Sequence, residues 1–302
     1  FFADMNLSVL LIYENRVAES WDLRVGNLEQ AQRLDDPSLL FAALFGIFVR
    51  PWAPHHHEFV ATLVTEQTQQ AGGPQIGTAV PRCLLVLGER ELAEDLWDRF
   101  RQEADRTRHP RALLASGEQE AVRATLDGQL EDAVRIAEEN LEIGESFGAA
   151  AAGAQRSAIG VRPLIYLGMF EEALRPIQWL MDVPVWGIHP STQAMCHAHM
   201  GLHDEARGGL RRTMEQGGIT AEQDETTEVV LAHLLEAAVL AEDREATEVL
   251  SQWLAALSHL SVFYVVNVCP GRILGSAASL LGKPNEAREL YLQGLEASEK
   301  LR

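Results

Sequence analysis

The sequence predicts an all-α protein, built as a right-handed superhelix of about seven to eight helical hairpins in one continuous domain over residues 1–302. The main observation is a recurring pair of residues, in which a small residue is followed, five positions later, by an alanine that begins an amphipathic segment. Successive alanines lie 40, 40, 33, 40 and 41 residues apart, and a period of this length is typical of stacked helical hairpins. The pairs are Gly88/Ala93, Gly128/Ala133, Gly168/Ala173, Gly201/Ala206, Ala241/Ala246 and Gly282/Ala287.

The composition supports the same fold class. Hydrophobic residues make up 47% of the chain, which is enough for burial along its whole length. In a stacked array each hairpin packs on its neighbours, so a chain of 302 residues needs no single large core.

Residues 1–78 carry the periodic pattern only weakly. Val17–Leu34 and His57–Gln70 each have apolar residues at helical spacing. Each segment ends at a break, Asp35-Asp36-Pro37 after the first and Gly72-Gly73-Pro74 after the second. We therefore expect two divergent hairpins in 1–78, followed by six clear repeats in 79–302.

The last repeat shows the physical logic of the unit most clearly. Apolar residues in 274–281 recur at helical spacing, and Gly282 follows them where the chain must turn through a positive φ. Pro284 suits the first turn of the next helix, because its missing N–H costs nothing there. Two helices joined by so short a turn approach closely near Ala287, and a larger side chain would push them apart.

The charge of the chain excludes two classes of partner. Aspartate and glutamate outnumber lysine and arginine by 44 to 25, so the net charge is −19. Such a chain repels phosphate backbones and anionic lipids, and we expect no direct nucleic-acid partner. We also expect no membrane, because no apolar stretch approaches the roughly 20 residues that span a bilayer.

The three cysteines are far apart and have no CxxC spacing, which favours free thiols and a cytoplasmic location. The chain does not begin with methionine. We therefore expect it to be a segment of a longer polypeptide, with a catalytic or DNA-binding domain possible outside it.

The repeats resemble the tetratricopeptide repeat, in its longer variant of bacterial regulators. The positions that carry this likeness are Leu274-Gly275, Gly282 and the Ala287/Tyr291 pair. Residues 280–291 (LLGKPNEARELY) and 126–135 (LDGQLEDAVR) are also similar to the C-terminal helical regions of large bacterial signal-transduction ATPases, such as maltose-regulator-like activators and ATPases fused to nucleotide cyclases. The resemblance implies a region that senses an inducer or partner, or that acts as a scaffold.

The same resemblance implies that ligands bind a concave face lined by the first helix of each hairpin. Arg82 and Arg162 each lie six residues before their turn glycine, and Arg272 lies ten before its own. Three guanidiniums in an acidic protein would suit a carboxylate-bearing peptide or an anionic small molecule. Glu118 and Gln155 would line the same face. The alternative is that these arginines form ordinary local ion pairs.

Two groups of residues are candidates for metal binding, and we expect neither to bind a metal. Cys196, His199 and His203 are spaced i, i+3 and i+7, but Gly201 occupies the turn and should carry His203 off the common face. Residues 55–57 are three consecutive histidines, whose side chains point apart on a helix or strand. We expect these histidines on a solvent-exposed helix start.

No catalytic motif is present: the sequence contains no GxxxxGK[ST], GxGxxG, HExxH or GxSxG. We therefore expect no cofactor and a non-enzymatic function, as an interaction or sensor module of a bacterial cytoplasmic regulator that binds a protein or peptide partner, or a ligand, on its concave face. One alternative is a small-molecule receptor that encloses an inducer. Another is an enzyme with a loop-borne site near Trp52 or Trp186.

Overall fold

The computed structural model describes residues 1–48, 52–69, 79–148, 152–180, 188–222, 225–263 and 267–302. In these ranges the chain forms sixteen α-helices and two short 3-10 helices, and no strand, so the all-α prediction is confirmed there. The helices are α1 (Phe2–Tyr13), α2 (Val17–Leu34), α3 (Pro37–Phe48), α4 (His57–Gln69), α5 (Ala79–Leu87), α6 (Arg90–Thr107), α7 (Pro110–Leu126), α8 (Leu130–Ser146), α9 (Ala152–Tyr166), α10 (Phe170–Leu180), α11 (Ile188–His199), α12 (His203–Gly217), α13 (Glu228–Leu240), α14 (Arg244–Leu254), α15 (Pro270–Leu280) and α16 (Pro284–Glu299).

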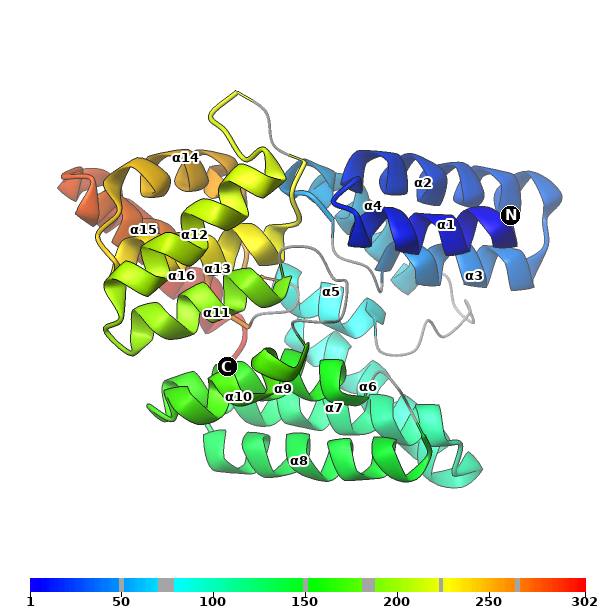
Figure 1. The fold of residues 1–302 in the computed structure, drawn as a ribbon. Helices are drawn as coiled ribbons and strands as arrows, with labels where there is room; N and C mark the ends of the chain where they lie inside the picture. The colour runs from blue at the N-terminus through cyan, green and yellow to red at the C-terminus, as the bar shows by residue number, and fades with distance from the viewer. Residues whose placement is uncertain (49–51, 70–78, 149–151, 181–187, 223–224, 264–266) are drawn as a thin grey trace.

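The helices pack mainly on their neighbours in the sequence, as a helical repeat requires. Figure 1 shows α1–α4 on one side, α6–α10 below and α11–α16 on the other side, with α5 between them. The first helices of successive hairpins also contact one another, α7 with α9, α11 with α13, and α13 with α15. In the described part of the chain, no helix is both long enough and apolar enough to cross a membrane.

The six predicted turns share one hydrogen-bond pattern, in which a residue of positive φ closes the first helix. At the first of them the N–H of Gly88 donates to the carbonyl of Leu85, and the next N–H, of Glu89, donates to that of Leu84. This is the Schellman motif, which satisfies the last carbonyls of a helix. The same pattern recurs around the positive-φ residues Gly128, Gly168, Gly201, Glu242 and Gly282.

The alanine five positions after each turn glycine lies in the first turn of the second helix and is buried. The N–H of Ala93 donates to the carbonyl of Glu89, the N-cap residue of the second helix, and the equivalent bond recurs in the other hairpins. All five of these alanines are buried, namely Ala93, Ala133, Ala173, Ala206 and Ala287. Their burial agrees with the expectation that a small side chain is favoured at this position.

In the fifth repeat the predicted pair Ala241/Ala246 is displaced by one residue. Glu242, and not Ala241, has the positive φ, at 57°, and Thr247 has the hydrogen bond that the alanine makes in the other hairpins. Thr247 can be buried there because its hydroxyl donates to the carbonyl of Asp243 over 2.7 Å. Sequence alone favours the small residues, so it places the turn on an alanine that in fact ends the helix.

This correction can be tested with two glycine substitutions. Glu242→Gly should stabilise the protein by about 1 kcal/mol, because an exposed L-residue of positive φ is replaced by one without the steric penalty. Ala241→Gly should destabilise it by about 1 kcal/mol, because Ala241 has φ −84° and is buried. Urea unfolding followed by circular dichroism measures both, and the opposite order would restore the original register.

One of the two divergent hairpins expected in 1–78 has the same turn. Asn15 has φ 59° and takes the place of the glycine, and the N–H of Arg16 donates to the carbonyl of Leu11. Ser20 replaces the alanine, and its buried hydroxyl donates to the carbonyl of Ser8 over 2.7 Å. Because Asn15 and Ser20 replace the glycine and the alanine, a search for the glycine/alanine pattern does not find this turn. The connection from α3 to α4 passes through residues 49–51, and residues 72–74 also lie outside the described residues.

The chain also folds back on itself. The N–H of Ser261 donates to the carbonyl of Val86 over 3.0 Å, and the guanidinium of Arg90 donates to the carbonyl of Leu301. A Cβ on Gly88 would lie 2.9 Å from the Lys300 side chain. The end of the last hairpin therefore packs against the turn between α5 and α6.

Candidate functional site

The first helices α9, α11 and α13 carry a column of side chains at equivalent positions. Arg162, Met195 and Glu236 each lie six residues before the positive-φ residue of their hairpin, which is Gly168, Gly201 or Glu242. Because α11 packs on α13 and consecutive helices are in contact, these equivalent positions come together.

A buried ion pair crosses this column. Arg162 Nη1 lies 2.8 Å from Glu236 Oε2, and the side chains are only 4% and 7% exposed. The second terminal nitrogen of Arg162 lies 3.1 Å from the sulfur of Met195, and its guanidinium carbon is 5.7 Å from the centre of the Tyr166 ring. The pair joins α9 to α13 past α11.

The other oxygen of Glu236 has two further partners. Glu236 Oε1 lies 3.2 Å from His199 Nε2 and 3.4 Å from Arg272 Nη2. Burial alone would raise the pKa of Glu236, but the charges of Arg162 and Arg272 and the hydrogen bond with His199 hold it well below its ordinary value. We call Arg162, His199, Glu236 and Arg272 the Glu236 cluster. Two guanidiniums face one carboxylate, so the cluster carries one excess positive charge in a chain of net charge −19.

Two titratable side chains beside the cluster are uncharged at neutral pH. Burial raises the pKa of the Cys196 thiol to about 12. Burial, with the charge of Arg162, lowers the pKa of His233 to about 3. The ring of His233 is held by Thr192, whose Oγ1 lies 3.1 Å from Nδ1. Neither group is prepared for nucleophilic or acid–base chemistry near pH 7.

The predicted residues Arg82 and Glu118 form a second ion pair, away from the Glu236 cluster. Arg82 Nη2 lies 3.7 Å from Glu118 Oε2, and both side chains are mostly buried. Burial raises the pKa of Glu118, and the charge of Arg82 opposes that shift. The geometry repeats that of Glu236 and Arg272 with the charges exchanged, because in both pairs a residue six positions before one turn meets a residue ten positions before the next.

The structure thus brings Arg162 and Arg272 together on Glu236, and pairs Arg82 with Glu118. Gln155 is part of α9, but its side chain lies outside the described residues. The sequence reasoning missed Glu236 itself. Glu236 lies five residues before Ala241 but six before Glu242, and six is the spacing of the column. Because the sequence places the turn at Ala241, it does not identify Glu236 as a member of the column.

The residues of the metal candidates are separated as the turn glycine implies. Cys196 and His199 lie on α11, whereas His203 is exposed at the start of α12, beyond Gly201. Among the described residues, no three histidine, cysteine or acidic side chains are placed to hold a metal ion.

The expectation that residues 55–57 form a solvent-exposed helix start was wrong for His56 and His57, which are both buried. The His56 ring stacks on that of Trp21 at 3.9 Å between centroids, so a partner in α2 covers it. His55 is exposed, and its Nε2 lies 3.8 Å from Glu225.

Of the two tryptophans that mark the loop sites considered for an enzyme, Trp52 is among the described residues. Trp52 is buried, and its carbonyl accepts a hydrogen bond from the N–H of Glu228 over 3.0 Å. Trp186 lies outside the described residues. No family model matches this sequence, and no curated protein is significantly similar to it.

Proposed function

We propose that this chain is a non-enzymatic interaction module of a bacterial cytoplasmic regulator, and that it binds an acidic peptide segment of a partner protein along α9, α11, α13 and α15. The observation that carries the proposal is the excess positive charge of the Glu236 cluster in a strongly acidic chain. A peptide carboxylate would find there its complementary charge, and the surrounding negative charge would reject most other anionic surfaces.

Within the cluster, Arg272 is the residue that can contact a partner. Its side chain is 49% exposed, and a guanidinium has five N–H donors in a fixed fork that fits a carboxylate. Arg162 lies buried behind it and neutralises Glu236. That carboxylate in turn holds one edge of Arg272, so the arginine is oriented before a partner arrives.

The finer architecture is part of the same proposal. Shared Schellman turns, buried small residues after them and contacts between successive first helices are what stacked tetratricopeptide-like hairpins in a right-handed superhelix would produce. In such an array the first helices line the inner face, where the Glu236 cluster lies.

The test uses peptides as probes. Fluorescent peptides rich in Asp and Glu should bind the protein, and the same peptides with Asn and Gln should not. Arg272→Ala should weaken binding at least tenfold, since charge-assisted hydrogen bonds contribute about 1.5–3 kcal/mol. Higher salt should weaken binding as well, because the contact is exposed.

Arg288→Ala is the matched control, because it removes the same charge from an exposed position on α16 outside the cluster. Equal loss of binding in Arg272→Ala and Arg288→Ala would mean that binding depends on the net charge of the protein and not on the Glu236 cluster. Unchanged binding in Arg272→Ala would exclude the inner face. A protein that binds no acidic peptide but gains thermal stability from a small molecule would instead favour the receptor alternative.

A further inference from the structure

An open groove of about 280 Å³ lies between α14 and α16, with α15 at its base. α15 packs against both of these helices. Because the walls and the base are helical, their main-chain N–H and C=O groups are bonded within each helix along most of its length. The groove therefore offers side chains to a ligand, and a bound peptide must satisfy its own main chain.

The base of the groove is apolar. Leu274 and Ala278 of α15 and Leu281, its C-cap residue, follow one another at helical spacing and form one stripe. Leu281 is half-buried, and so is Leu290, which lines the same groove from α16. Ala255, the residue after the end of α14, is exposed. Leu281, Leu290 and Ala255 give a ligand apolar surface that it can reach.

The rim of the groove is acidic. Glu248 of α14 is exposed and belongs to no ion pair among the described residues. Glu286 of α16 has Lys283 as its partner, with 3.6 Å between Oε2 and Nζ. Two carboxylates and one ammonium group therefore line the groove, which leaves one negative charge uncompensated on the α14 side. A cationic side chain beside Glu248 would complement that charge.

We propose that this groove docks a basic amphipathic helix of a partner protein, with its apolar side chains on Ala255, Leu281 and Leu290 and an arginine or lysine on Glu248. A helix satisfies its own main-chain groups, whereas a peptide that binds as an added β-strand needs free main-chain partners. The groove has about twice the volume of the ~150 Å³ cavity that holds benzene, so it fits two leucine-sized side chains. A helix presents two such side chains one turn apart on one face.

The charge of the chain disfavours the other occupants. A second copy of this chain would bring a further net charge of −19 to a rim that already has an uncompensated carboxylate. An anionic lipid surface would be repelled in the same way. A basic segment is attracted instead, so charge selects the partner and the apolar base of the groove holds it.

The groove and the Glu236 cluster lie on opposite sides of α15. The stripe residues come two, six and nine positions after Arg272, which at about 100° per residue places them about 180–240° around the helix from it. The inner face should bind an acidic peptide and the groove a basic helix, so the two proposals are independent. Arg272→Ala should leave the basic helix bound, and Glu248→Gln should leave the acidic peptide bound.

Two neighbouring alanines provide a variant and its matched control. Ala255 and Ala256 are both exposed in the short 3-10 helix Ala255–Leu257, and Ala255 lines the groove whereas Ala256 does not. Ala255→Arg should place a bulky cation in the groove and weaken binding of a basic helix at least tenfold. Ala256→Arg adds the same charge to the same short helix and should bind like the parent. Because both positions are exposed, both variants should fold.

Substitutions of the rim charges should act in opposite directions. Glu248→Gln should weaken binding about two- to fivefold, which is the range of an exposed ion pair. Glu245→Gln is its control, because Glu245 is exposed on α14 but does not line the groove, and it should leave binding nearly unchanged. Lys283→Gln should strengthen binding, since it removes the cation that neutralises Glu286. Equal effects of Glu248→Gln and Glu245→Gln would mean that only the net charge matters.

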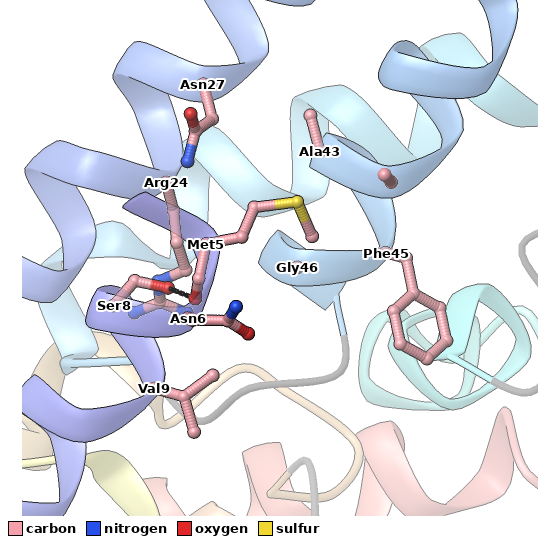
Figure 2. A pocket seen from close by; sticks show the side chains of 10 residues that line it. Met5, Asn6, Ser8, Val9, Arg24, Asn27, Ala43, Phe45 and Gly46 are labelled. Atoms are coloured by element: carbon pink, nitrogen blue, oxygen red, sulfur yellow. Dashed lines mark hydrogen bonds between the residues drawn. The ribbon is translucent and has the colours of Figure 1, made fainter. Parts of the chain in front are cut away.

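A smaller hollow between α1, α2 and α3 provides a second control. Its volume is about 130 Å³, and Figure 2 shows Met5, Val9 and Phe45 in its lining. None of the described residues that line it is acidic, so a basic helix has no counter-charge there. A Cβ built on Gly46, on the α3 side, meets nothing within 4 Å. Gly46→Leu should therefore fill this hollow and leave the basic helix bound.

The experiment measures fluorescence anisotropy of labelled peptides of about 14 residues, or four helical turns. Three peptides contain alanine, arginine and one apolar residue type, which is leucine, methionine or phenylalanine, placed on one face of the helix. At least one of them should bind the parent protein. It should bind at least tenfold more tightly than a peptide of the same composition with the apolar residues spread around the helix, and than the same peptide with glutamate in place of arginine.

The proposal is overturned if none of the three one-faced peptides binds, if the spread or acidic peptide binds as well, or if Ala255→Arg and Ala256→Arg bind equally. It is also overturned if Gly46→Leu loses binding and Ala255→Arg does not, because the helix would then dock at the hollow between α1, α2 and α3. If light scattering shows a dimer that Ala255→Arg dissociates, the occupant is a second copy and the proposal is wrong.

Discussion

Glu236→Ala should lower the free energy of unfolding by about 3–5 kcal/mol, because it leaves the Arg162 guanidinium charged and buried with no counter-ion. Arg162 is 4% exposed, so water cannot replace the carboxylate without opening the contact between α9, α11 and α13. Burial of an uncompensated charge is among the few single changes that cost this much. Urea unfolding followed by circular dichroism gives the change in the free energy of unfolding, when the parent and the variant have the same slope of free energy against urea concentration.

Two further variants separate the buried ion pair from a general loss of packing. The double variant Arg162→Met/Glu236→Leu should recover most of the lost stability, because well-packed apolar residues can replace a buried ion pair at little cost. Glu103→Ala breaks an exposed pair with Arg106 on α6, and it should hardly move the unfolding midpoint. If Glu236→Ala shifts the unfolding midpoint as little as Glu103→Ala does, the cluster does not contribute to the stability of the fold.

Acidification from pH 7 to pH 5 should destabilise the protein by several kcal/mol. Burial lowers the pKa of His56 to about 3, of His57 to about 4 and of His233 to about 3. Between an unfolded pKa near 6.5 and these folded values, the unfolded chain binds protons that the folded chain does not. Stability therefore falls as pH falls through this window, by about 2 kcal/mol for each histidine at pH 5.

Thermal unfolding at pH 7, 6 and 5 measures the effect. His233→Gln should reduce the loss of stability between pH 7 and pH 5 by about 2 kcal/mol, because the contribution of one buried histidine is removed. His203→Gln, at an exposed position, should leave it unchanged. The raised pKa of Glu118 acts in the opposite sense, so a stability that is flat or that increases toward pH 5 would mean that the carboxylates dominate and would contradict the prediction.

Much of the fold could be predicted because each hairpin turn imposes two local demands. The turn needs a residue that tolerates positive φ, and the contact after it needs a small side chain. Gly128 meets the first requirement and Ala133 meets the second, so both can be recognised in the sequence. Gly128 has a positive φ and Ala133 is buried, as predicted. The prediction failed where a polar residue meets a demand in another way, as Thr247 does with its hydroxyl and Asn15 with its positive φ.

The candidate site could be predicted in part, and the reason lies in the same register. Arg162 and Arg272 were chosen by counting back from turn glycines, and both reach the Glu236 cluster. Glu236 lies in a helix that is almost wholly buried and apolar, Glu228–Leu240, and no local pattern separates it from a surface residue. Glu236 gains its partners only because α13 lies beside α9, α11 and α15. A local sequence period does not predict which distant segments pack together.

The contact between the end of α16 and the turn after α5 limits how many hairpins can lie between these two helices. An open array can gain or lose a unit by duplication, because each unit meets only the ones beside it. Here Ser261 must reach Val86 and Leu301 must reach Arg90. Adding or removing one hairpin between them would carry those partners apart, so these contacts fix the number of hairpins between Val86 and Leu301.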